Sequence, residues 1–178
     1  LHAFKTLDGI SDAPITASSV QAQLLTTGGT TTSGTITGYW SLSSGSRLQA
    51  TYSADLAEYY EGDKDYEVGT VLVFGGDKEV TTTKVAGDTK VAGVVSNTAG
   101  YVMYDACPGF KNLIALQGRV PCKVVGRIYK GDLLTTSGIP GVAVRASGDV
   151  KVGSLVGKAL ENYDSDHIGT IEIAVGRT

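Results

Sequence analysis

Short runs of β-branched residues, each ended by a turn signal, recur along most of this 178-residue chain. Glycine contributes 24 residues and joins proline, aspartate and serine in turn signals such as "GGDK", "SGIPG" and "SGD". β-Branched side chains favour extended backbone, whereas clusters of glycine, proline, aspartate and serine favour tight turns. The pattern indicates an all-β fold, a compact β-sandwich or barrel-like roll. About nine strands are predicted: 70–74, 80–85, 91–95, 113–116, 123–128, 132–136, 142–145, 155–160 and 170–175.

Residues 51–63, "TYSADLAEYYEGD", depart from this pattern because acids and tyrosines crowd together there. Leu56, Tyr59 and Tyr60 recur at the spacing of one helix face. We therefore expect a short helix near residues 55–60, ahead of the predicted strands.

The segment before residue 50 is poor in charge. Arg47 is the sole charged residue in "LLTTGGTTTSGTITGYWSLSSGSRLQA". Such a stretch buries too little apolar surface to hold a fold by itself. Ile36, Trp40 and Leu42 nevertheless fall on even positions, which suits strands that pair with other chains. The composition favours an intertwined, fibrous arm over a simple linker.

The change in composition divides the chain into two parts. Residues 1–50 are expected to form a Thr/Ser/Gly-rich fibrous arm or shaft end, and residues 51–178 a globular β-rich C-terminal domain. A chain of this length fits one large domain or a smaller domain with an appendage. Because the sequence lacks an initiator Met, we expect it to be part of a longer protein.

The bulk charge and hydropathy exclude two classes of partner. Lys and Arg number 15 against 18 Asp and Glu, giving a net charge of −3 with no basic run. A nucleic-acid partner is therefore not expected. No apolar stretch approaches the length of about 20 residues that spans a bilayer, so membrane insertion is not expected either.

The acidic cluster does not match a metal site. Asp63, Asp65 and Glu67 stand at alternate positions, as in a calcium loop, but the glycine and the terminal acid of that loop are missing. A solvated acidic face is the simpler interpretation. We expect no metal and no cofactor.

The cysteines and histidines do not suggest a zinc site. Cys107 and Cys122 lie outside any CxxC motif, and His2 and His167 lie near opposite ends of the chain. The two cysteines could pair as a disulfide or stay as buried, apolar thiols, and the sequence leaves both open.

Motifs of conventional enzymes are not found. The sequence contains neither GxxxxGK[ST] nor GxGxxG. "NYDSDHIG", residues 162–169, holds Asp, Ser and His letters, but neighbouring side chains diverge and do not build a triad. The residues favour a non-enzymatic role.

Aromatic residues offer a candidate binding surface. Trp40 lies in the predicted arm, and Tyr59 and Tyr60 lie where the arm meets the domain. Tyrosine and tryptophan suit both sugar stacking and protein interfaces, because they bury area at low entropic cost. Between a glycan site and a junction between subunits, we favour the junction.

Four segments in order resemble a known family. They are "ADLAEYYEGDKDYEVGTVLVFGGDKEVT", "DTKVAGVVSNTAGYVM", "IALQGRVPCKVVGRIYKGDLLTTSGIPGVAV" and "GSLVGKALENYDSDHIGTIEIAVGRT". Over about residues 35–178 the chain resembles the C-terminal domain of phage tail-fibre and virion structural proteins, above all those of contractile-tailed (myovirus) phages of cyanobacteria. More distantly, "DLAEYYE" and "VAGVVS" resemble the self-cleaving C-terminal domain of podovirus neck appendages.

The resemblance implies a β-rich tip domain at the end of a homotrimeric fibre, which aids assembly and register of the shaft. It implies a place in the virion, on a phage tail or fibre, with assembly in the host cytoplasm and other tail or fibre proteins as partners. Two alternatives stay open. One is a host-attachment tip that binds surface polysaccharide, and the other is an intramolecular chaperone that cleaves itself.

Self-cleaving relatives are cut at a serine-aspartate junction just before the domain. Here the junction reads Ser53-Ala54-Asp55, with an alanine between the two residues. The dyads Ser11-Asp12 and Ser165-Asp166 are displaced from it. We therefore expect no catalytic residues, and retain Ser53, Asp55 and Glu58 as the candidates if cleavage occurs.

Overall fold

The computed structural model describes residues 41–47, 49 and 54–176. Most of the predicted arm, and the predicted boundary near residue 50, lie outside the described residues and stay predictions. Within 41–47, the Ser46 amide donates a hydrogen bond of 3.0 Å to the Ser43 carbonyl.

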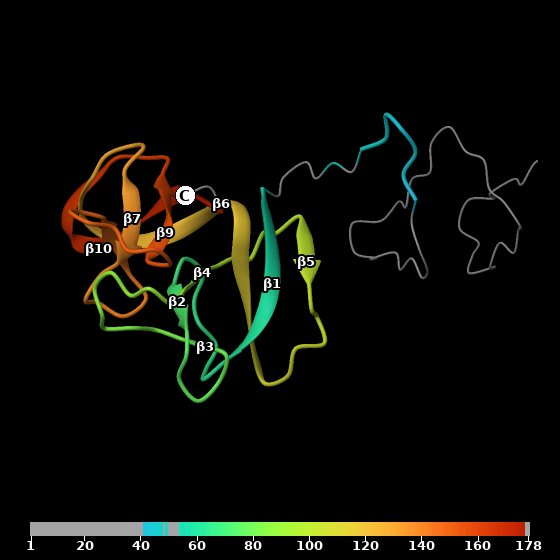
Figure 1. The fold of residues 1–178 in the computed structure, drawn as a ribbon, viewed down its shortest axis with the longest axis horizontal. Coiled ribbons are helices and arrows are strands. Elements are labelled where there is room, and N and C mark those ends of the chain that lie inside the picture. The colour runs from blue at the N-terminus through green and yellow to red at the C-terminus, as the bar shows by residue number, and fades with distance from the viewer. Residues whose placement is uncertain (1–40, 48, 50–53, 177–178) are drawn as a thin grey trace, which may run out of the picture. The chain divides into compact units, whose positions relative to one another are not determined.

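From Ala54 onward the described chain is all-β, as predicted, and contains no helix (Figure 1). Its ten strands are β1 (Asp55–Gly62), β2 (Val71–Phe74), β3 (Val80–Thr81), β4 (Val91–Val95), β5 (Tyr101–Met103), β6 (Phe110–Ile128), β7 (Leu133–Thr136), β8 (Ala143–Arg145), β9 (Leu155–Ala159) and β10 (Tyr163–Val175).

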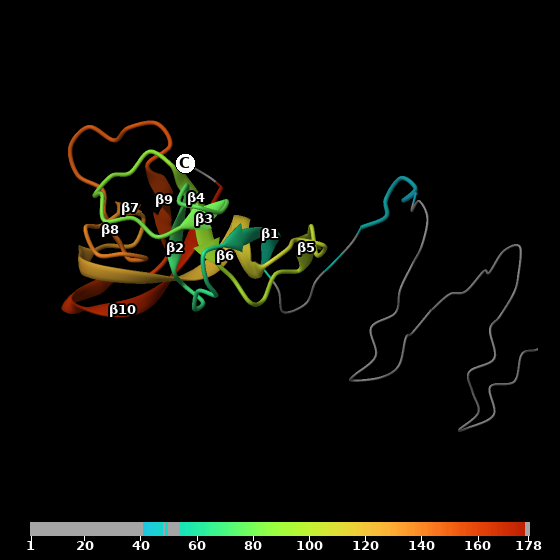
Figure 2. The ribbon, with the colours of Figure 1, turned by 90° about the horizontal axis from the view of Figure 1, so that it is seen from below.

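All ten strands belong to one mixed sheet that closes on itself twice around β6. The first half of β6 pairs with β1 and β4, and β2 and β3 complete a ring of five strands. The second half of β6 pairs with β8 and β10, and β7 and β9 complete a second ring. Figure 2 shows β6 running through the domain as the strand common to both. Of the two architectures expected, the barrel-like roll is the better description.

Two apolar cores lie on opposite faces of the β2–β4–β6 segment of the sheet. Side chains along a strand alternate between its two faces. Val71, Val94 and Ala115 therefore face the larger core. The residues next to them in sequence, Leu72, Val95 and Ile114, face the smaller core. Burying each large aliphatic side chain contributes about 1.5–3 kcal/mol. The smaller core holds Leu72, Val80, Val95 and Ile114. The larger core also contains Val120, Cys122, Val124, Ile128, Leu134, Ala143, Val156, Ala159, Ile171, Ile173 and Val175.

The predicted short helix near residues 55–60 is wrong, because this segment is strand β1. Every residue of β1 pairs with β6, from Asp55 opposite Gly118 to Gly62 opposite Phe110. This ladder supplies the backbone hydrogen bonds that a helix would otherwise make within itself. Long-range pairing therefore overrides a local spacing of three apolar residues.

Four other predicted elements differ in extent, among them the run 170–175, which is the second half of β10. The runs 113–116 and 123–128 are parts of the single strand β6, and the run 80–85 shortens to β3. Strand β5 was missed because it is only three residues long and mostly exposed, so it lacks a buried alternating face.

Among the described residues, no helix has the length and apolar character needed to cross a membrane.

Candidate functional site

The backbone is held firmly where residues 1–53 join the domain. The Arg119 amide of β6 donates to the Ala54 carbonyl at 3.0 Å, and the Gly100 amide donates to the Asp55 carbonyl at 2.9 Å. Gly118 of β6 lies so close that a side chain there would collide with the Ala54 carbonyl oxygen. We call Ala54 and the start of β1, residues 55–58, together with β5 the junction edge.

Asp55 is an uncompensated acid at this edge. Asp55 is only 6% exposed, and neither of its carboxylate oxygens has a hydrogen-bond partner among the described residues. Burial raises the pKa of Asp55 above its ordinary value of 3.8, and the nearby Ser96 hydroxyl opposes only part of that effect. A buried, unpaired carboxylate destabilises the folded state. It therefore marks a position that packing alone does not explain.

Glu58, the other acid retained as a candidate if cleavage occurs, already accepts a hydrogen bond. The Tyr60 hydroxyl donates to Glu58 Oε2 at 2.8 Å. Burial first, and then the Glu58 carboxylate, raise the pKa of Tyr60 to about 12. Strand alternation places Glu58 on the opposite face of β1 from Asp55. The structure thus does not bring the two acids together, and Ser53 lies outside the described residues.

The two predicted binding tyrosines also face opposite ways. Tyr60 packs edge-on against Phe74, with ring centroids 5.5 Å apart, beside the smaller core. The Lys111 ammonium group lies over the Tyr59 ring, with Nζ 5.5 Å from the ring centroid. The two tyrosines do not form one platform, and Trp40 lies outside the described residues. Tyr59, Tyr66 and Val68 instead help to line an open hollow of about 320 Å³.

Strand β5 forms the outer part of the junction edge. Leu56, Ala57 and Glu58 of β1 pair in parallel with Tyr101, Val102 and Met103. Beyond β5, Tyr104 adopts a φ of 56° and is the one non-glycine residue of the described chain with positive φ. A bulky side chain rarely adopts this conformation, so the backbone there is strained.

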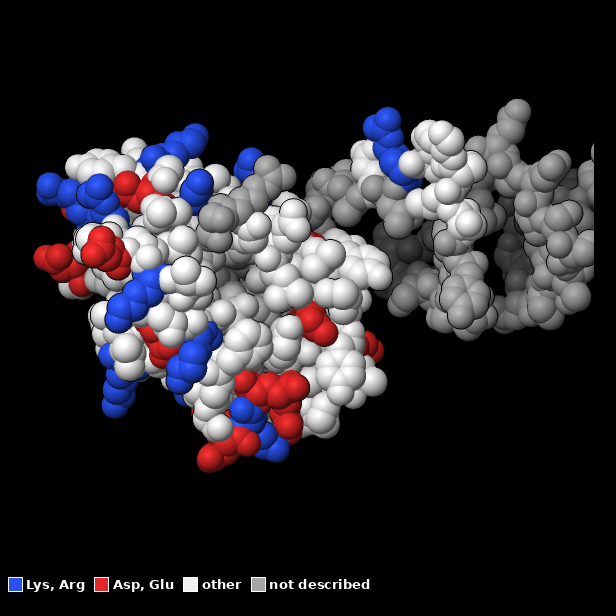
Figure 3. Space-filling model, in the orientation of Figure 1, with Lys and Arg blue, Asp and Glu red and all other residues white. Residues whose placement is uncertain are grey.

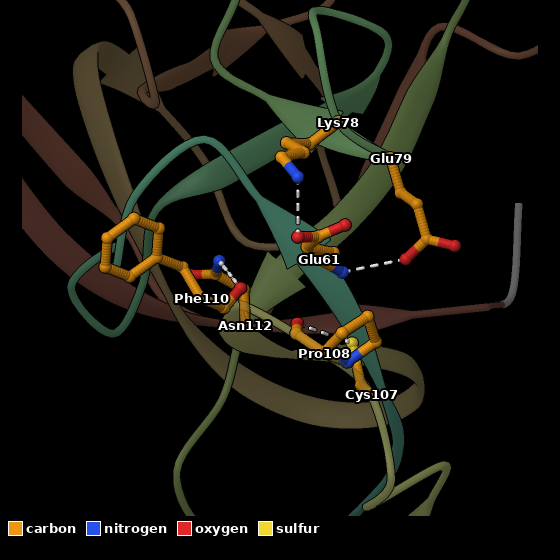
Figure 4. Close-up of polar contacts among 7 residues, drawn as sticks. All are labelled: Glu61, Lys78, Glu79, Cys107, Pro108, Phe110 and Asn112. Carbon is orange, nitrogen blue, oxygen red and sulfur yellow. Dashed lines mark hydrogen bonds and ion pairs between the residues drawn. The ribbon is translucent and has the colours of Figure 1, made fainter.

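A polar cluster closes the other end of β1 (Figure 4). Lys78 Nζ pairs with Glu61 Oε1 at 2.8 Å, and the Glu61 amide donates to Glu79 Oε2 at 2.7 Å. These contacts tie the loop before β3 to β1 and complete the first ring.

Asn112, drawn in the same view, holds the following loop in place. Its amide nitrogen donates to the carbonyls of Lys64 and Phe110, at 3.0 and 3.1 Å, and its Oδ1 accepts the Tyr66 amide at 2.9 Å. Asn112 is a buried residue that the sequence predictions missed. A sequence signal was available, because in "FKNLIAL" the Asn112 amide stands directly before the apolar residues 113–116.

Both cysteines are buried and free. Burial raises the pKa of Cys122 to about 12, and the Cys107 thiol donates to the Pro108 carbonyl at 3.6 Å (Figure 4). Of the two interpretations left open by the sequence, the structure shows buried thiols rather than a disulfide.

The acidic cluster does not converge on a metal. The Asp63 carboxylate accepts the Tyr66 and Thr81 hydroxyls, at 2.6 and 3.1 Å, while Glu67 pairs with Lys123 at 2.7 Å. Among the described residues, no group of three or more His, Cys, Asp or Glu could hold a metal ion.

Of the two displaced dyads, Ser165-Asp166 is described, and Ser165 pairs with Gly126 of β6, eight residues along β6 from the partner of Asp55. Ser165 and Asp166 belong to β10, where the Ser165 hydroxyl accepts the His167 amide at 3.1 Å. Ser11 and Asp12 lie outside the described residues.

No protein-family model matches the sequence. No curated protein matches it either.

Three solved structures, all from bacteriophage phi29, are similar in fold. The C-terminal fragment of gene product 12 has a TM-score of 0.48 at 16% identity, over 68% of this chain and 99% of that one. Pre-mature gene product 12 has a TM-score of 0.49 at 16% identity, over 71% of this chain and 22% of that one. The head fibre gp8.5 N base has a TM-score of 0.38 at 17% identity, over 67% of this chain and 93% of that one. At these identities and TM-scores, the similarity concerns the fold alone.

Proposed function

We propose that this chain is the structural, trimerising C-terminal tip of a phage tail fibre or virion appendage, and that it aids assembly and register of the shaft. The observation that carries the proposal is the backbone hydrogen bonding at the junction. Ala54 and Asp55 are fixed to β6 and to the loop before β5 by two backbone hydrogen bonds, and Gly118 packs against them. A domain that sets the register of preceding chains must hold their ends in fixed positions.

The composition of the arm explains why such a domain is needed. Three charge-poor arms that intertwine lose much chain entropy before any contact between them forms. Three domains that associate first place the arm ends side by side and raise their local concentration. In this account, the four family motifs lie in the C-terminal domain, and the shaft needs that domain in order to assemble.

Deletion of residues 55–178 tests this assembly role. The remaining arm segment is expected to be monomeric and rapidly degraded by protease, while the full chain is associated and its arm is protected. Recovery of a soluble, trimeric and protease-resistant arm without the domain would overturn the proposal.

In this proposal the protein belongs to the virion, is assembled in the host cytoplasm and contacts other tail or fibre proteins. The resemblance of its four motifs to virion structural proteins supports that placement. A pull-down from phage-infected cells, using the full chain and the arm-deleted domain, identifies the partners and the part that binds them.

Host attachment is a second candidate function, favoured by the hollow beside Tyr59 and Tyr66. Aromatic rings beside an open hollow suit stacking against sugar rings. A glycan array tests this directly: a specific signal that is lost in Tyr59→Ala or Trp40→Ala but kept in Tyr60→Phe supports surface-polysaccharide binding. An empty array sinks it.

Self-cleavage is a third candidate, favoured by the buried Asp55 carboxylate beside the junction. The intervening Ala54 and the separation of Asp55 from Glu58 on β1 oppose it. Denaturing mass spectrometry of a freshly expressed longer chain decides: a fragment that begins near residue 54 establishes cleavage, and an intact mass rejects it.

A further inference from the structure

Strand β5 is the one described strand with a single neighbour in the sheet. The other nine belong to the two rings that close around β6, whereas β5 pairs with β1 alone. Its outer side therefore carries backbone groups without a strand partner among the described residues. Open edges of this kind pair readily with another chain.

The side chains at this edge are large, apolar and exposed. Tyr101 is 58% exposed, Val102 44% and Tyr104 52%. Asp105, the charged residue just beyond, is paired with Lys111 at 3.3 Å. In Figure 3 the part of the domain over β1 and β5 is mostly uncharged, whereas charged groups gather over the β7–β10 side and at the lower tip. Contiguous exposed apolar residues rimmed by polar ones mark interaction sites.

We propose that β5, with Tyr101, Val102 and Tyr104, is the surface on which a second copy of this chain docks. The position of the junction selects this occupant. Residues 1–53 join the domain at Ala54, and β5 is the strand paired with the first residues of β1. When arms from several copies run together, these junctions gather around the common axis. Strand β5 of each copy then faces a neighbour.

The chemistry of the edge fits a second copy. Each chain carries a net charge of −3, so copies repel unless they meet where charge is sparse. A cyclic trimer also repeats the same contact three times. The short β5 edge, with its three large side chains, therefore contributes buried apolar area to three interfaces. This inference rests on the proposed function, since it names the surface through which the copies associate.

A charge placed at the edge tests the inference. Val102→Glu puts a carboxylate into the interface and is expected to weaken association of the full chain by about tenfold or more. Val152→Glu is the matched control, since Val152 is 97% exposed in the loop before β9. It is expected to change association by less than about twofold. Sedimentation over a range of concentrations measures both variants, with circular dichroism to confirm that each is folded.

Amide hydrogen exchange of the unmutated chain gives an answer even where Val102→Glu fails to fold. The amides of residues 101–104 are expected to exchange more slowly at concentrations where the chain associates. An associated wild type with unchanged exchange at β5, or a folded Val102→Glu variant that associates normally, overturns the inference and leaves the proposed function standing. A wild type that stays monomeric at every concentration overturns both.

Discussion

Gly118 of β6 and Asp55 of β1 lie so close that a Cβ built on Gly118 would stand 2.7 Å from the Asp55 Cα. Gly118 has a φ of 119°, which side-chain-bearing residues rarely adopt. Absence of a side chain here lets two backbones meet, and it lets β6 continue from the first ring into the second. The close approach of β1 and β6 at the junction thus depends on one glycine.

Replacement of Gly118 by alanine is expected to destabilise the domain by roughly 2–4 kcal/mol, because neither strand can move without breaking its ladder. Gly148→Ala is the control: its φ is also positive, at 71°, but no atom lies within 4 Å of the added Cβ. That change is expected to cost only about 1 kcal/mol of conformational strain. Denaturant midpoints measure both, and equal losses would refute the close-approach argument.

Asp55 is expected to reduce stability at neutral pH. Since burial raises its pKa in the folded state, the folded chain holds this proton more tightly than the unfolded chain. The free energy of unfolding therefore falls as pH rises from about the ordinary pKa of 3.8 through the folded value, and the full penalty remains above it.

Asp55→Asn removes this charge and is expected to stabilise the domain at pH 7 by about 1 kcal/mol. The gain shrinks towards zero below pH 3.8, where Asp55 is protonated in both states. Asp77→Asn, at an exposed carboxylate, is the control. A loss of stability in Asp55→Asn at pH 7 would show instead that the carboxylate is favourably engaged.

Tyr60 is expected to give the domain an alkaline limit. Its pKa is raised to about 12 from an ordinary value of 10.0, so the folded state keeps the phenol proton longer than the unfolded state does. Stability therefore decreases as pH rises between these two values. Tyr60→Phe should flatten this slope, as measured by unfolding at several alkaline pH values. An unchanged slope in Tyr60→Phe would contradict the prediction.

Asn112→Ala is expected to destabilise the domain by about 2–4 kcal/mol, because two carbonyls and one amide lose their partner in a buried site. Asn97→Ala, at an exposed asparagine, is expected to be nearly neutral. Thermal or denaturant unfolding compares them. A neutral Asn112→Ala would mean that other groups replace all three hydrogen bonds.

The strand content was predictable because it depends on local signals. β-Branched runs ended by glycine or proline located β2, β4, β7, β8 and β9 closely. The predictions of secondary structure failed where pairing between distant strands decides the conformation. Leu56, Tyr59 and Tyr60 show a helical spacing, yet β6 draws them into a strand. Gly118 and Pro121 look like strand breakers, yet β6 continues through both.

The site was predictable in part. Asp55 was a candidate from its place at the junction, but its unpartnered burial depends on packing against β6 and the loop after β4. Tyr59 and Tyr60 were grouped because they are adjacent in sequence, and strand alternation places them on opposite faces. The docking surface on β5 had no signal, since a three-residue exposed strand shows no periodicity.

Sedimentation equilibrium of the intact 178-residue chain tests the central claim most directly. If copies of this domain associate to hold the ends of their arms in register, the mass is three times 18.4 kDa. A mass of 18.4 kDa at every concentration would contradict the account.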